Sequence, residues 1–189
     1  MSDGLSNLPQ FVGLSGYARS GKDTVARFLV AGYGYRRIAF ADRLKRFAAT
    51  LYPSVAEILN DAGGDWETAK DNPEVRRILQ GVGAAARDHI GPDVWVTAAL
   101  GSVRDDERIV VSDMRFINEA DALAARGAVL FRIERPGTRP INNHVSETAL
   151  DQYDGFHAVL VNDSTFEALY AQVHTALVEM SLALVTGDE

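Results

Sequence analysis

Residues 12–30, VGLSGYARSGKDTVARFLV, decide the fold. An apolar run leads directly into the segment 16–22, GYARSGK, and the chain continues at once in an amphipathic helical pattern. Two glycines and a lysine at the spacing Gly16-x4-Gly21-Lys22, between a strand and a helix, are typical of a phosphate-binding loop. The glycines let successive backbone N–H groups turn toward a phosphate, and the helix N-terminus adds its positive dipole. Lys22 then supplies a mobile positive charge to the β- and γ-phosphates.

The residues next to this lysine depart from the usual pattern. Asp23 stands where Ser or Thr is usual, and the hydroxyl group moves one place along to Thr24. We expect Thr24 to contact Mg²⁺, directly or through water. Arg19, inside the loop, either reaches the phosphates or is a solvated loop arginine.

Composition sets the broad class of the protein. The 189 residues are 47% apolar and 24% charged, which predicts one globular domain with a full three-layer core. The absence of cysteine excludes a disulfide scaffold and thiolate zinc sites, and it indicates a reducing compartment. The N-terminal MSDGLSNLPQ lacks the basic and apolar regions of a signal peptide. No apolar run approaches the ~20 residues of a membrane helix, so we expect a cytoplasmic protein without membrane contact.

The charge balance points to small phosphorylated ligands. A net charge of −7 argues against a binder of polymeric nucleic acid, which needs a basic surface. The basic residues are 16 Arg and only 3 Lys. Arginine makes bidentate contacts with phosphate, so the bias suits an enzyme of phosphorylated substrates. The base composition of the genome explains the same bias equally well.

Apolar runs alternate with helical patterns along the chain. Such alternation predicts right-handed crossovers and a mostly parallel five-stranded sheet covered on both faces, a three-layer α/β/α fold. The predicted strands are Phe11–Ser15, Arg37–Phe40, Ile109–Ser112, Val129–Ile133 and Ala158–Val161. Capping boxes are predicted at Ser54 with Glu57 and at Ser164 with Glu167, and an N-cap at Asn72 followed by Pro73.

Two segments interrupt this alternation. Residues 60–72, NDAGGDWETAKDN, are polar and contain glycine. Residues 135–154, RPGTRPINNHVSETALDQYD, contain two prolines and show no clear period. A long unpatterned segment in a compact domain is usually functional or disordered, and we interpret residues 135–154 as a lid.

A second candidate site follows the predicted strand at 109–112. Asp113 comes directly after that strand, the position that often holds Mg²⁺ beside a phosphate loop. Arg115 and Phe116 follow at the carboxyl end of the sheet, where ligands bind in doubly wound folds. Either Arg115 binds a phosphate and Phe116 stacks on a base, or the three residues are an Asp turn, a surface arginine and a core phenylalanine.

Two further polar positions are open to two interpretations. Asp42, in 38-IAFADRLKRFA-48, is either an N-cap or a ligand of a substrate hydroxyl. Arg87 ends a predicted helix that contains Gly81 and Gly83. Glycine inside a helix is unfavourable, so close packing or the approach of a ligand must explain these two.

Taken together, the motifs resemble the deoxynucleoside monophosphate kinases of bacteriophages. The resemblance covers roughly residues 11–170 and rests on 16-GYARSGKDTVA-26, 40-FADRLK-45, 79-LQ with Gly83 and Arg87, Trp95, 112-SDMRFINEADAL-123, 132-RIERPG-137, 144-HVSETALD-151 and 161-VNDSTFEAL-169. It implies one phosphate-loop kinase domain over residues 1–189, with the lid at about 135–154. It also implies ATP- and Mg²⁺-dependent phosphorylation of dNMPs in deoxynucleotide biosynthesis, commonly by a homodimer.

The resemblance also implies roles for individual residues. ATP is expected to contact the loop residues Gly16, Tyr17, Ala18, Arg19, Ser20, Gly21, Lys22, Asp23 and Thr24, with Arg139, Asn162 and Asp163 beyond the loop. The acceptor is expected to contact Phe40, Asp42, Lys45, Arg87, Trp95, Arg115, Phe116, His144 and Glu147. The catalytic set is Lys22, Arg115, Arg132 and Arg135, and the metal ligands are Thr24 and Asp113.

Other functions remain open at this point. Animal-type phosphomevalonate kinase shares the Gly-Lys-Asp loop and a Ser-Asp-x-Arg strand end. Dephospho-coenzyme A kinase shares the general plan and an acidic residue after the second strand. A non-enzymatic nucleotide switch is a third reading, although the guanine-reading Asn-Lys-x-Asp motif is absent.

Overall fold

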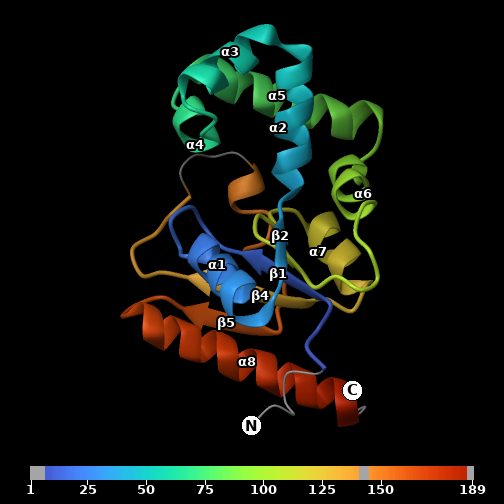
Figure 1. Cartoon of the computed structure of the whole chain (residues 1–189), viewed down its shortest axis with the longest axis vertical. Helices are drawn as coiled ribbons and strands as arrows, with labels where there is room; N and C mark the ends of the chain where they lie inside the picture. Colours follow the sequence, from blue (N-terminus) through green and yellow to red (C-terminus); the bar gives the residue numbers. More distant parts are fainter. Residues whose placement is uncertain (1–6, 141–144, 187–189) are drawn as a thin grey trace. The chain divides into compact units, whose positions relative to one another are not determined.

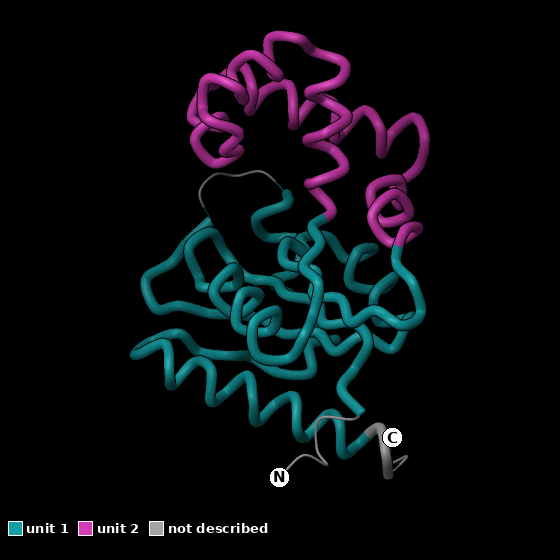
Figure 2. The backbone as a smooth tube through the Cα atoms, viewed as in Figure 1, with its two compact units in different colours: residues 1–39, 103–189 teal, residues 40–102 magenta. Residues whose placement is uncertain are grey.

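The computed structural model describes residues 7–140 and 145–186. The chain divides into two compact units, residues 1–39 with 103–189, and residues 40–102 (Figure 2). We call the first the sheet unit and the second the helical unit. The helical unit is an insertion in the sequence of the sheet unit, between its second and third strands.

The sheet unit is built on five strands. Its elements are β1 (Phe11–Ser15), α1 (Lys22–Tyr33), β2 (Arg36–Ile38), β3 (Ile109–Val111), α7 (Ile117–Ala124), β4 (Val129–Glu134), the 3₁₀ turn η1 (Val145–Glu147), β5 (Ala158–Val161) and α8 (Phe166–Thr186) (Figure 1). The strand order is β2-β3-β1-β4-β5, and each neighbouring pair of strands is parallel. The predicted three-layer α/β fold with a parallel sheet is therefore confirmed.

The two faces of the sheet carry different helices. On one face, Val12, Leu14 and Phe131 belong to the main core together with side chains of α1 and α8. On the other face, a Cβ built on Gly13 would lie 3.1 Å from Leu123 of α7. The alternation follows from the two-residue period of a strand. Of the helices in the described residues, α8 included, none is long and apolar enough to span a bilayer.

The predicted strands occur with small differences at their ends. β2 covers Arg36–Ile38 rather than Arg37–Phe40, because Phe40 already begins the next helix. There it is buried and shares the helical spacing of Leu44 and Ala48. β3 ends at Val111, although the N–H of Ser112 still donates to Ile38 at 3.1 Å. β4 continues to Glu134, which pairs with Val161.

One of the three predicted helix caps is confirmed. Asn72 caps its helix through a hydrogen bond from the N–H of Glu74, and Pro73 is the first helical residue. The box at Ser54 is wrong, because α3 begins at Pro53 with Tyr52 as N-cap. The box at Ser164 is also wrong, since the Thr165 hydroxyl accepts the N–H of Ala168 at 3.3 Å instead. Both errors come from neighbouring residues that cap or start a helix equally well.

The helical unit contains five helices among the described residues. They are α2 (Phe40–Leu51), α3 (Pro53–Asp61), α4 (Trp66–Ala69), α5 (Pro73–His89) and α6 (Val94–Leu100). Ala48, Val55, Val75, Ile78 and Leu79 form its core. The polar segment 60–72 is not wholly irregular, because Asp65 caps α4 by accepting the N–H groups of Glu67 and Thr68 at 3.1 and 3.0 Å.

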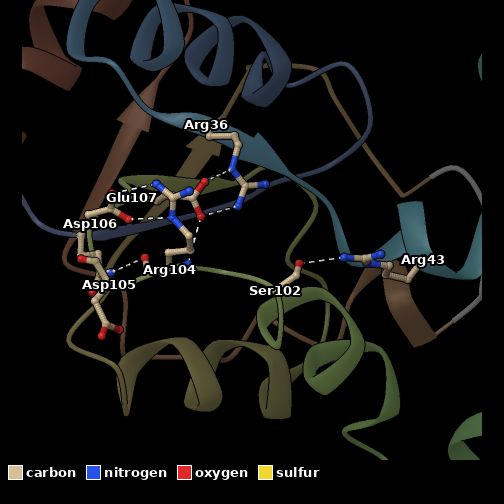
Figure 3. A network of polar contacts seen from close by, with 8 residues as sticks. Arg36, Arg43, Ser102, Arg104, Asp105, Asp106 and Glu107 are labelled. Carbon is tan, nitrogen blue, oxygen red and sulfur yellow. Dashed lines mark hydrogen bonds and ion pairs between the residues drawn. The ribbon is translucent and has the colours of Figure 1, made fainter.

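Polar contacts fix the points where each unit begins and ends (Figure 3). In the sheet unit, Arg36 of β2 binds Glu107 through two hydrogen bonds of 2.9 Å each. Glu107 also accepts the N–H of Arg104 at 3.0 Å, which holds the segment that leads into β3. In the helical unit, Arg43 donates to the hydroxyl of Ser102 at 2.8 Å, so its first helix is tied to its last residue.

Candidate active site

The loop between β1 and α1 has the backbone of a phosphate cradle. Gly16 and Gly21 adopt φ values of 142° and 111°, and Arg19 has a φ of 65°. The N–H of Ser20 donates to the carbonyl of Tyr17 at 3.1 Å, which closes a turn inside the loop. Gly21 is the N-cap of α1, whose first residue is Lys22. The N-terminus of a twelve-residue helix therefore opens directly from the loop.

Close packing explains why both loop positions are glycine. A Cβ on Gly16 would collide with the carbonyl oxygen of Ile133, and one on Gly21 would lie 2.5 Å from Nδ2 of Asn162. The Asn162 amide donates to the carbonyl of Ser20 at 2.8 Å, and its backbone N–H donates to Glu134 at 2.7 Å. The ends of β4 and β5 thus pack against the loop and support it.

Lys22 is the charged centre of this loop. The residue is only 8% exposed, and its Nζ donates to the carbonyl of Tyr17 at 3.1 Å. Burial lowers the pKa of Lys22, and the charge of Arg115 lowers it further, while Asp23, Glu147 and Asp113 act in the opposite direction. An anion bound at the loop would also raise the pKa of Lys22, because a nearby negative charge favours the charged form of a lysine.

Arg115 is fixed from two sides. Its Nη1 binds Oε1 of Glu147 in η1 at 2.8 Å, and its backbone N–H donates to Oε2 of Glu119 at 2.7 Å. The same Glu119 oxygen accepts the N–H of Phe116 at 3.1 Å. The buried carboxylate of Glu119 therefore holds the turn between β3 and α7, and the charge of Arg115 is close enough to lower the pKa of Lys22.

A small pocket in the sheet unit brings the loop together with Arg115 and Glu147. The residues around it come from the end of β1 and the phosphate loop, from the turn after β3, from β4, and from segment 145–151. They are Ser15, Gly16, Tyr17, Ala18, Met114, Arg115, Arg132, Ser146, Glu147, Leu150 and Asp151. The pocket therefore lies at the carboxyl ends of the parallel strands, where ligands bind in this class of fold.

Arg132 of β4 enters this pocket from the sheet. Its guanidinium donates to Oδ1 of Asp151 at 2.8 Å and to the carbonyl of Leu150 at 3.0 Å. Tyr17 of the phosphate loop donates its hydroxyl to the other Asp151 oxygen at 2.7 Å. This hydrogen bond is the main reason that the pKa of Tyr17 is raised above its ordinary value.

The other predicted residues of the sheet unit lie outside the pocket lining. Arg135, Arg139 and Asp163 are exposed, and Arg135 begins a turn in which Thr138 donates to its carbonyl at 3.1 Å. Asp23 is exposed in the first turn of α1, and the Thr24 hydroxyl accepts from Arg27 at 3.3 Å. His144 lies outside the described residues.

The helical unit carries the remaining predicted residues. Phe40 and Trp95 are buried, and the Trp95 indole N–H and Nη1 of Arg87 both donate to the carbonyl of Gly83, at 3.3 and 3.1 Å. Gly83 is packed against Leu44, whereas a Cβ on Gly81 would meet no other atom within 4 Å. Close packing therefore explains Gly83 and leaves Gly81 unexplained.

Asp42 and Lys45, two residues predicted to contact the acceptor, both lie in α2. Asp42 is not an N-cap, because α2 begins two residues earlier at Phe40. Its carboxylate lies in the first helical turn, where it is favourable to the helix dipole. The Nζ of Lys45 lies 5.8 Å from the centre of the Trp66 ring, a cation–π contact.

The family model and the curated relatives name the same kinase family. The family model for deoxynucleotide monophosphate kinase matches residues 59–173. A putative deoxynucleotide monophosphate kinase of Acanthamoeba polyphaga mimivirus is 32% identical over 86% of this chain and 93% of its own length. A deoxynucleotide monophosphate kinase of Escherichia phage RB69 is 26% identical over 67% of this chain, and the aligned part is 51% of that longer protein. The crystal structure of TT1252 from Thermus thermophilus aligns over 91% of this chain and 98% of its own, with a TM-score of 0.46 and 17% identity.

Proposed function

The chain belongs to the deoxynucleotide monophosphate kinase family, and from this membership we propose that it transfers the γ-phosphoryl group of ATP to a deoxynucleoside monophosphate. The products are a deoxynucleoside diphosphate and ADP. One observation carries the proposal: Gly16, Tyr17 and Ala18 of the glycine-bounded loop border the same pocket as Arg115, and the buried Lys22 begins the helix that follows this loop. A loop of this kind beside an arginine suits a donor and an acceptor that are both phosphates.

The donor phosphates are proposed to bind the loop. Backbone N–H groups between Gly16 and Lys22 and the N-terminus of α1 would surround the β-phosphate, and Lys22 would exchange the carbonyl of Tyr17 for a phosphate oxygen. Arg19, on the exposed side of the loop, is a further candidate for the donor phosphates. Arg135, Arg139 and Asp163 are proposed to approach the donor nucleotide only when it is bound, since they do not border the pocket.

The acceptor phosphate is proposed to bind Arg115. This guanidinium would give up or share its contact with Glu147. A phosphate with a second pKa near ~6 is largely dianionic at pH 7, so its oxygen needs no general base. The protein then has to position the two phosphates in line and neutralise the charge of the transferred group, which are the main contributions in phosphoryl transfer.

The residues beside the loop fit a magnesium ion. Mg²⁺ is usually bound through one or two protein oxygens together with substrate phosphates, so a cage of three or more acidic or histidine side chains is not required, and the described residues contain none. The charge of Asp113 is close enough to Lys22 to raise the pKa of the lysine, and Thr24 places a hydroxyl in the first turn of α1. We propose these two as the residues that hold the ion, which would neutralise charge on the donor phosphates.

The nucleoside of the acceptor is proposed to involve the helical unit. Asp42, Lys45 and Arg87 of this unit offer polar groups, whereas its aromatic candidates Phe40 and Trp95 are buried and would have to become accessible to contact a base. Support for this part is the resemblance of 40-FADRLK-45 and of the segment from Leu79 to Trp95. The same resemblance is the support for a homodimer, which light scattering of the purified protein would test.

A coupled ADP-release assay over a panel of acceptors tests the proposed function. The panel contains the four dNMPs, the four NMPs, phosphomevalonate and dephospho-coenzyme A, with a reaction lacking acceptor as the blank. We expect turnover with at least one dNMP, well above the blank. Turnover only with phosphomevalonate or dephospho-coenzyme A would contradict it, and hydrolysis that no acceptor stimulates would favour a nucleotide switch.

A further inference from the structure

Asp151 occupies a junction between three parts of the sheet unit. Its two carboxylate oxygens have different partners, Arg132 of β4 at 2.8 Å and the hydroxyl of Tyr17 in the phosphate loop at 2.7 Å. Its own chain segment is the one that carries Glu147, four residues earlier. One side chain therefore joins the sheet, the donor-side loop and the acceptor-side segment.

The Arg132 side chain is held too firmly on this junction to be a mobile phosphate ligand. It is only 12% exposed and also donates to Glu134 at 3.1 Å and to the carbonyl of Leu150 at 3.0 Å. Its guanidinium carbon lies 5.5 Å from the centre of the Tyr17 ring and 5.9 Å from that of Phe156. The two aromatic rings and the three oxygen acceptors together hold the Arg132 guanidinium in one orientation, facing Asp151.

The junction continues to the proposed acceptor-binding group. Leu150, next to Asp151, is buried, and Glu147 at the other end of the same segment binds Arg115. A continuous series of contacts thus runs from Tyr17 through Asp151 and the segment 147–151 to the guanidinium of Arg115. The distance between a loop that holds the donor and an arginine that holds the acceptor depends on this connection.

Resting on the proposed function, we propose that Asp151, with Tyr17 and Arg132, is a positioning group that sets the phosphate loop in register with the acceptor-binding Arg115. In this role Arg132 acts through Asp151 instead of touching the transferred phosphoryl group. Misplacement of reacting groups by about 1 Å can cost roughly 10²-fold in rate. Loss of the junction should therefore lower kcat more than it weakens the binding of either substrate.

Tyr17→Phe and Asp151→Asn test this inference. Tyr17→Phe removes only the hydroxyl and keeps the ring beside Arg132; Asp151→Asn keeps the shape and removes the charge. We expect each to lower kcat by about 10-fold or more, with the KM values for ATP and dNMP within about threefold of wild type. Because the two residues act as one group, the double variant should lose little more than the more damaged single variant.

Tyr33→Phe is the matched control. It removes a tyrosine hydroxyl from a hydrogen bond of similar length, 2.6 Å to Nδ1 of His174, at the far end of α1 from the loop. A kcat for Tyr17→Phe equal to that of Tyr33→Phe would overturn the inference, as would independent, multiplying losses in the double variant. Either result leaves the proposed function standing provided that the wild-type protein turns over a dNMP. Absence of wild-type turnover would overturn both.

A spectroscopic titration checks the contact itself without turnover. Tyrosinate absorbance followed against pH should show that one tyrosine of Asp151→Asn ionises at lower pH than in the wild type. The same curve in Tyr17→Phe should lack that group. An unchanged tyrosinate titration in Asp151→Asn would show that Tyr17 does not donate to Asp151 in solution and would overturn the inference.

Discussion

Gly16→Ala tests the packing of the phosphate loop against the sheet. Two costs add at this position. The backbone has φ = 142°, a region that an L-residue occupies at a cost of about 1–3 kcal/mol. The new methyl group would also collide with the carbonyl oxygen of Ile133 and lie 2.7 Å from Oγ of Ser20. Backbone shifts forced by such overpacking typically cost about 1–3 kcal/mol, so we expect a loss of roughly 2–6 kcal/mol in the free energy of unfolding.

Gly34→Ala separates these two costs. Gly34 caps the C-terminus of α1 at φ = 72°, and a Cβ there would meet no atom within 4 Å. Only the left-handed backbone penalty applies, about 1–2 kcal/mol. Because both variants carry a backbone penalty of similar size, the difference between them reports mainly the collision at Gly16.

Urea unfolding followed by circular dichroism gives both free energies, and titration with a fluorescent ATP analogue gives the affinity of each folded variant. We expect Gly16→Ala to be the less stable of the two by more than about 1 kcal/mol and to bind the analogue at least about tenfold more weakly than Gly34→Ala, since relief of the collision moves the loop. Equal stability and equal affinity in the two variants would refute the close approach of the loop to β4.

Three other predictions concern single side chains. Lys22→Ala should fold and lose at least about 10²–10³-fold in kcat, the usual effect of removing one charge-stabilising group; activity near wild type would place the ATP phosphates elsewhere. Asp42→Asn should raise the KM for the acceptor and leave kcat nearly unchanged. A loss of about 10²-fold or more in kcat at saturating acceptor would identify Asp42 as a general base. Desolvation lowers the pKa of His157, whose Nδ1 accepts the N–H of Leu130 at 3.1 Å, so the unfolded chain binds a proton first as the pH falls below about 6.5. The stability of the wild type should therefore fall more steeply than that of His157→Gln between about pH 7 and 5, and identical slopes in urea unfolding would contradict this.

Local patterns were enough to predict the sheet and the glycine-bounded loop between β1 and α1. The strand before Gly16 is buried throughout, and the spacing of Gly16, Gly21 and Lys22 has an immediate backbone meaning. The errors occur where two neighbouring residues satisfy the same local rule. Thr165 caps α8 in place of Ser164, and Phe40 satisfies a helical pattern as well as a strand pattern.

The contacts that support the candidate site were harder to predict from the sequence. Glu119 has a local signal, since an acidic residue at the third helical position often binds the N–H groups before the helix, and here it holds Arg115 and Phe116. Asp151 has none, because its partners lie 134 and 19 residues away in the chain. Contacts between distant segments depend on the packing of the whole unit, which periodicity and spacing do not report.

The fate of the γ-phosphoryl group tests the central claim most directly. ATP labelled in its γ-phosphate is incubated with the protein, Mg²⁺ and each dNMP in turn, and the products are separated by chromatography. Transfer between phosphates at the loop predicts label in the β-phosphate of a deoxynucleoside diphosphate, formed in equal amount to ADP and lost in Lys22→Ala. Label found only in inorganic phosphate, with every dNMP unchanged, would contradict it.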